Sequence, residues 1–73
     1  MSELQDQMTA AKVKTELNID EELKNAGITV ECVRGVVHLR GTVASEALRQ
    51  RATRAARRVQ TVLRVVNELE VKA

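Results

Sequence analysis

The stretch ITVECVRGVVHLRGTV, residues 28–43, decides the fold of this 73-residue chain. Apolar residues alternate with polar ones on both sides of Arg34 and Gly35, as in two strands that each bury one face. Turn-forming residues stand only at the centre and near the end of the stretch. The pattern therefore predicts a β-hairpin with strands at 28–33 and 36–43.

The length of the loop sets the register of this hairpin. A two-residue loop pairs Val30 with Leu39 and Cys32 with Val37, so the inward side chains all face one side. A three-residue loop would set Val30 against His38, which a buried face does not tolerate. The remaining predicted pairs are Val33 with Val36 and Ile28 with Gly41.

Two glycines have structural roles in this prediction. The favoured two-residue loop needs a positive φ at both central residues, which Gly35 adopts freely and Arg34 adopts less easily than Asn or Asp. Gly41 is expected to leave room where a helix approaches the sheet.

Composition limits the remaining possibilities. A chain of this size forms one small domain, residues 1–73, and without aromatic residues its core must be aliphatic. No ring is present to stack a base or to form a cation-π cage. Residues 1–33 carry three basic and seven acidic residues, whereas residues 34–73 carry nine basic and three acidic.

The location of the protein depends on its context. No apolar run approaches the length of a membrane span, and the N-terminus MSELQDQMTAAK is too polar for a signal peptide. We expect a cytoplasmic protein if this is the native full chain, and a periplasmic or membrane-peripheral one if it is a domain cut from an exported protein. The single cysteine cannot form an internal disulfide.

Residues 2–17 are predicted to form the first helix, with residues 1–5 expected to fray. Helical spacing gives this segment two apolar stripes. The core-facing stripe consists of Ala10, Val13 and Leu17, and the opposite one of Leu4, Met8, Ala11 and Thr15. Leu4 and Met8 either are singly exposed side chains or contact a partner subunit, a neighbouring domain or lipid headgroups.

Residues 18–27 form a polar connection that contains three consecutive acids, Asp20, Glu21 and Glu22. These acids lack the glycine turn and the later bidentate glutamate of a calcium loop. A solvated turn or the start of one helical turn is therefore expected, with Leu23 as its apolar anchor.

The second long helix is predicted from Ser45, a good N-cap, to about Val59. Its core stripe consists of Leu48, Ala52, Ala55, Ala56 and Val59. The opposite face carries Arg51, Arg54, Arg57 and Arg58, with Arg49 on its flank and Glu46 the only acid expected nearby.

This helix returns the chain for a third strand, residues 62–71, parallel to the second by a right-handed crossover. Val65, Leu69 and Val71 are expected to face inward, and Val66, Glu68 and Glu70 outward. The predicted fold is α+β, in the order αββαβ, with a three-stranded mixed sheet of order 1-2-3 and two helices on one face.

Two motifs carry a family resemblance. Residues 35–43 fit G-x-V-x-L-x-G-x-V, and Val62, Val65, Asn67 and Leu69 fit V-x-x-V-x-N-x-L. The chain resembles the BON domain family over nearly its whole length, although Thr61 stands where the family usually has glycine. The resemblance implies a non-enzymatic domain of bacterial envelope and osmotic-stress proteins, described as a phospholipid-binding or protein-interaction module.

The residues themselves argue against catalysis. Cys32 is predicted to point into the core and His38 outward, opposite Glu31, so the two cannot act as a nucleophile and its base. Glu31 and His38 are expected to form a cross-strand pair. We expect no enzyme, no zinc site and no cofactor.

The arginine face is either a solvated helix exterior or a binding surface. Its candidate partners are anionic phospholipid or another envelope component, nucleic acid, and the acidic half of a second copy. Nucleic acid is disfavoured because the chain has neither an aromatic platform nor helix-turn-helix spacing.

The outward face of the sheet offers an alternative surface. Val33, Val36 and Val66 are expected to gather at one end of a face that otherwise suits water. This patch favours a homo-oligomer or a scaffold role as the second functional hypothesis.

Overall fold

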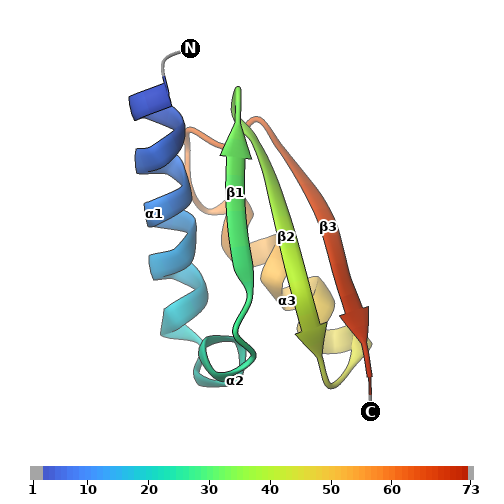
Figure 1. Cartoon of the computed structure of the whole chain (residues 1–73). Helices are drawn as coiled ribbons and strands as arrows, with labels where there is room; N and C mark the ends of the chain where they lie inside the picture. The colour runs from blue at the N-terminus through green and yellow to red at the C-terminus, as the bar shows by residue number, and fades with distance from the viewer. Residues whose placement is uncertain (1–2, 73) are drawn as a thin grey trace.

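The computed structural model describes residues 3–72. A three-stranded sheet is covered on one face by two long helices, and α1 flanks β1 at one edge (Figure 1). The elements are α1 (Glu3–Ile19), α2 (Glu21–Asn25), β1 (Thr29–Val33), β2 (Val36–Val43), α3 (Glu46–Arg57) and β3 (Arg64–Val71). The predicted α+β class and the strand order β1-β2-β3 are confirmed, and the third helix, α2, is a short additional element.

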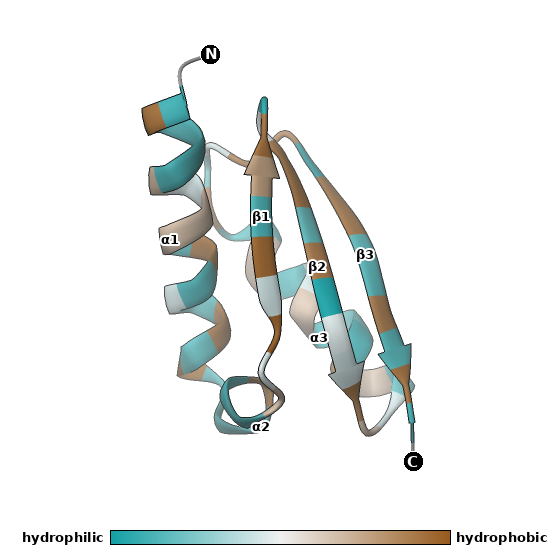
Figure 2. Cartoon of the chain, in the orientation of Figure 1, coloured by the Kyte–Doolittle hydropathy of each residue, from teal (hydrophilic) through white to brown (hydrophobic). Residues whose placement is uncertain are grey.

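The hairpin has the predicted register. Val33 pairs with Val36, Cys32 with Val37 and Val30 with Leu39. Arg34 adopts φ 53° and Gly35 φ 82°, so both loop residues take the left-handed conformation that a two-residue hairpin requires. The strands show the expected alternation of hydropathy (Figure 2).

Strand β3 lies parallel to β2, as the crossover through α3 predicts. It begins at Arg64, two residues later than expected, although Val62 still packs against the core. Val71 was expected to face inward, but its side chain is 42% exposed. Val71 has the parity of the buried Leu69 but is the last residue of β3, an edge strand, and its side chain is therefore open to solvent.

The core is aliphatic. Val37 and Leu39 of β2 are fully buried in a core that they share with side chains of α1 and α3, and every residue predicted for the core stripe of α3 is buried. Ser45 caps α3, since its Oγ accepts a hydrogen bond from the N–H of Leu48 at 3.2 Å. This helix ends at Arg57, two residues before the predicted end.

Helix α1 extends two residues beyond its predicted end. Val13 and Leu17 are buried as expected, while Leu4 and Met8 are 66% and 49% exposed. Residues 3–5, which were expected to fray, belong to the helix, and residues 1–2 lie outside the described part of the chain.

The acidic cluster of residues 20–22 begins α2. Asp20 is the N-cap, and its Oδ1 accepts hydrogen bonds from the N–H groups of Glu22 at 3.1 Å and Leu23 at 3.4 Å. The expected single helical turn is therefore present, and Leu23 is buried as its anchor.

Gly41 was expected to make room for a helix, and this expectation is wrong. A Cβ at this position would lie closest to the backbone of Gly27 and Ile28 and to the side chain of Leu69. The neighbours of Gly41 therefore belong to the segment just before β1 and to β3, and its φ of 139° is the reason that glycine is favoured here.

Candidate functional site

The arginine face of α3 is not opposed by Glu46 alone, as the sequence suggested. Arg51 pairs with Asp20 and, at 3.3 Å, with Glu22 of α2. Arg58 lies 3.9 Å from Glu16 of α1. The acidic N-terminal half of the chain therefore folds against the basic helix and offsets part of its charge.

The pairing of Arg51 with Asp20 alters both pKa values. Burial raises the pKa of Asp20, but hydrogen bonds from Arg51 and from the α2 backbone outweigh it and lower this pKa below its usual value. The hydrogen bond to Asp20 raises the pKa of Arg51. Both side chains thus stay charged, and Arg51 is committed to holding α2 against α3.

Arg49 also forms hydrogen bonds within the fold. Its guanidinium donates to Glu46 at 3.1 Å, to the carbonyl oxygen of Leu69 at 3.2 Å and to that of Asn67 at 3.4 Å. In return, the Asn67 amide donates to the carbonyl oxygen of Arg49 at 2.8 Å and to Thr53 Oγ1 at 2.7 Å. These contacts fasten α3 to β3.

The two remaining arginines have different surroundings. Arg54 lines a hollow of about 400 Å³ that also contains Glu16 and Asp20. Arg57 instead lines a hollow of about 480 Å³ beside Leu63 and Arg64, where no acid contributes to the lining. Leu63 is 71% exposed there.

The hairpin loop adjoins this hollow. The carbonyl oxygen of Gly35 accepts hydrogen bonds from the N–H groups of Leu63 at 2.8 Å and Arg64 at 3.3 Å. The contact brings the loop residue Arg34, the adjacent Val33 and the segment after α3 to the same end of the molecule (Figure 1). We call this group the hairpin-end corner: Val33, Arg34, Arg57, Leu63 and Arg64.

Sequence reasoning named Arg57 and Val33 but missed the other members of the hairpin-end corner. Leu63 has the same parity as the inward-facing Val65 and Leu69, so the alternation of the following strand gives no sign that its side chain is exposed. Its neighbour across the chain, Gly35, is 28 positions away, so no local pattern reveals that Arg34 and Arg64 lie together.

Asp6 of α1 holds the hairpin loop in place. Its carboxylate accepts hydrogen bonds from the N–H groups of Arg34 at 2.9 Å and Gly35 at 3.1 Å. The bond from Arg34 is the main cause that lowers the pKa of Asp6. This residue was not singled out from the sequence, because an acid in a helical first turn is unremarkable.

Cys32 faces inward as predicted and is half-buried. Its Sγ lies 3.6 Å from Asp6 Oδ1. Burial raises the pKa of the Cys32 thiol, and Asp6 adds to the rise, so little of the reactive thiolate is present near neutral pH.

The outer face of the sheet carries a charge network. His38 was expected to pair with Glu31, but its Nδ1 lies 3.0 Å from Glu68 Oε1 on β3. Arg40 instead pairs with Glu31 and lies 3.5 Å from Glu68. Strand β2 lies between β1 and β3, so His38 has a carboxylate on either side, and its side chain pairs with the one on β3. The hydrogen bond from His38 is the main cause that lowers the pKa of Glu68.

The predicted valine patch is present in part. Val33 is 56% exposed, whereas Val36 and Val66 are half-buried. In the parallel register Val66 lies beside His38, two pairs along from the pair of Val36 with Arg64. Leu4 and Met8, the other predicted contact residues, lie on α1 and are not part of this patch.

Within residues 3–72, no three acidic, histidine or cysteine side chains gather in a way that would hold a metal ion. No helix in this part of the chain is long and apolar enough to cross a bilayer.

Comparison with known proteins assigns the family. Residues 5–73 match the family model of the BON domain. The chain is also 37% identical over 67 residues to osmotically-inducible protein Y of Escherichia coli (strain K12). That alignment covers 92% of this chain but 33% of the relative, so the chain spans about a third of its length. The chain carries both motifs of the family and has the predicted order of long helices and strands, αββαβ. It belongs to the BON domain family.

Proposed function

We propose that this BON-type module is non-enzymatic and binds the surface of anionic phospholipid membranes through the hairpin-end corner. The observation that carries the proposal is that Leu63, 71% exposed, lines the same hollow as Arg57 and Arg64. Exposed apolar side chains flanked by arginines are typical of proteins that lie on a membrane. A membrane-peripheral location follows from this proposal.

The internal ion pairs favour this corner over the whole arginine face. The guanidinium groups of Arg49 and Arg51 bond to other groups within the fold. Arg54 and Arg58 lie near carboxylates of Glu16 and Asp20. Arg57 and Arg64 line a hollow without an acid and can turn to lipid phosphates. Each engaged basic residue contributes on the order of 1 kcal/mol at an anionic surface.

Vesicle co-sedimentation tests the proposal. Binding is expected to vesicles that contain phosphatidylglycerol, to weaken with added salt, and to be weak with phosphatidylcholine alone. Arg57→Glu with Arg64→Glu should abolish binding. Lys12→Glu with Lys72→Glu makes the same change in net charge away from the corner and is the matched control. Binding that ignores lipid charge, or that both double variants reduce equally, would contradict the proposal.

A second candidate is self-association through the valine patch, favoured by the 56% exposure of Val33 at one end of the sheet. Its test is given in the Discussion.

A further inference from the structure

Strand β1 is an open edge of the sheet. The order β1-β2-β3 leaves β1 with one neighbour. In an antiparallel pair, alternate residues direct their N–H and C=O groups away from the partner strand. The two-residue loop makes Val33 and Val36 a hydrogen-bonded pair, so the outward-directed groups are those of Val30 and Cys32.

A groove runs along this edge between β1 and α1. One hollow of about 490 Å³ extends from Gly27 to Val30, and a second of about 420 Å³ continues from Val30 to Val33. The two hollows share Ala10 and Val30. Ala10, whose side chain is small, lines the groove on the α1 side where the two hollows meet.

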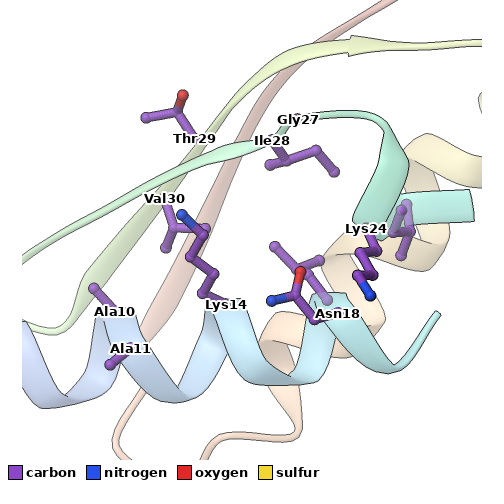
Figure 3. Close-up of a pocket in the computed structure, with 11 residues that line it drawn as sticks. Ala10, Ala11, Lys14, Asn18, Lys24, Gly27, Ile28, Thr29 and Val30 are labelled. Atoms are coloured by element: carbon purple, nitrogen blue, oxygen red, sulfur yellow. The ribbon is translucent and has the colours of Figure 1, made fainter. Parts of the chain in front are cut away.

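The two ends of the groove have opposite charge. Asn18 and Lys24 line the end beside Gly27, and Figure 3 shows Lys14 of the same hollow rising from α1 towards Val30. Glu3 and Asp6 line the end beside Val33. Within residues 3–72, the ammonium groups of Lys14 and Lys24 are not paired with a carboxylate.

We propose that this groove binds an extended peptide that ends in a free carboxylate and adds to the sheet as a fourth strand, antiparallel to β1. Exposed strand edges accept peptides in this way, with main-chain hydrogen bonds supplying affinity and flanking pockets supplying specificity. The direction is set by charge, because the carboxylate must lie at the lysine end and the peptide amino end at the acidic end.

The register of β1 defines the side chains that such a peptide needs. Peptide residues opposite Val30 and Cys32 point towards α1, where the space beside Ala10 suits a small apolar side chain. The residue opposite Glu31 points to the outer face, where a lysine is complementary. The probe is therefore the pentapeptide Val-Lys-Val-Thr-Val with a free C-terminus, whose central valine lies opposite Val30.

Binding is measured by isothermal titration calorimetry of the unlabelled peptide, which keeps both charged ends, and by amide chemical shifts of the ¹⁵N-labelled protein. Shifts are expected at the amides of Val30 and Cys32, with those of the outer sheet face little changed. Replacing the terminal carboxylate by an amide should weaken binding about tenfold, because charge-assisted hydrogen bonds are lost. Methylation of the central valine nitrogen should weaken it by a similar factor, since this N–H would bond to Val30.

Two controls separate strand addition from non-specific attraction. Methylation of the threonine nitrogen, which points away from β1, should change affinity less than about twofold. Lys14→Gln with Lys24→Gln should make the acid and amide peptides bind equally, whereas Lys12→Gln with Lys72→Gln should preserve the preference for the acid.

Three results would overturn the proposal. The first is absence of binding by the free-acid peptide. The second is equal loss of affinity from the two methylations. The third is a concentration-dependent shift of the Val30 and Cys32 amides without peptide, which would show that a second copy occupies the edge.

Discussion

The hydroxyl oxygens of Thr9 in α1 and Thr61 in the turn after α3 lie 2.7 Å apart, although 52 positions separate them in the sequence. Thr9 is 1% exposed, and its neighbours in the core are aliphatic. A buried hydroxyl is costly without a partner. The threonine at position 61, where the family usually has glycine, thus supplies the group that Thr9 needs.

The Thr9–Thr61 pair predicts a coupled effect on stability. Thr9→Val should lower the free energy of unfolding by about 1 kcal/mol, because the hydroxyl of Thr61 loses its partner. Thr9→Val with Thr61→Val should recover most of that loss. Urea unfolding followed by far-ultraviolet circular dichroism measures both, and strictly additive changes would show that the hydroxyls are not coupled.

Folding lowers the pKa values of Asp6, Asp20 and Glu68. The unfolded chain therefore binds more protons, and stability rises with pH in this range. The stabilisation is present above the ordinary values of 3.8 and 4.5, and is lost as pH falls through the lower folded-state values. Thermal unfolding between about pH 2 and pH 6 should show a falling Tm on acidification.

Asp6→Asn isolates the contribution of Asp6 to this pH dependence. It should lower Tm at neutral pH and reduce the loss of Tm on acidification, since the carboxylate that accepts from Arg34 and Gly35 is gone. An acid dependence identical to that of the unmodified chain would contradict the role given to Asp6.

Alanine variants of two glycines with positive φ distinguish the cost of backbone strain from the cost of a steric clash. Gly27→Ala meets no atom within 4 Å, so the left-handed φ of 67° alone should cost about 1 kcal/mol. Gly35→Ala should cost more, because its Cβ would lie 2.7 Å from Leu63 Cγ. Leu63→Ala in addition should reduce the cost towards that of Gly27→Ala, because only the Cβ atom of residue 63 then remains close, at 3.3 Å; urea unfolding measures each change.

Leu63→Ser tests the apolar part of the hairpin-end corner. Removal of this exposed side chain should weaken binding to phosphatidylglycerol vesicles by about 1–2 kcal/mol, which is roughly a tenfold loss. Stability should change little, because the side chain is 71% exposed. Leu4→Ser, another exposed leucine outside the corner, is the control, and an equal loss in both would place the membrane contact elsewhere.

Val33→Ser with Val66→Ser tests self-association through the valine patch. If the patch forms an interface, the double variant should shift a concentration-dependent assembly towards monomer in sedimentation velocity. An unchanged sedimentation profile would remove this second candidate function.

Much of the fold could be predicted because the deciding signals are local. The alternation around Arg34 and Gly35 gave the register, and the spacing of apolar residues in α3 gave its buried stripe. The differences lie at the ends of elements, such as Val71 at the end of β3, where alternation along the strand does not predict how much of a side chain is exposed.

The charged surfaces were predicted less well. The arginines of α3 are evident in the sequence, but their partners Asp20 and Glu16 come from helices about 30 or more positions earlier. The same applies to His38, for which the adjacent strand offered Glu31 and the crossover strand supplied Glu68. Choosing between such partners requires the positions of side chains after packing.

The amino-acid sequence by itself determined the hairpin, the strand order, the aliphatic core and the family, because periods of two and 3.6 residues and turn residues act over short distances. Only the tertiary structure decided which arginines remain available, that Leu63 and Arg64 join the hairpin loop, and that α1 leaves a groove beside β1. The physical reason is that ion pairs and grooves depend on how helices lie against the sheet, and that arrangement is set by the whole core at once.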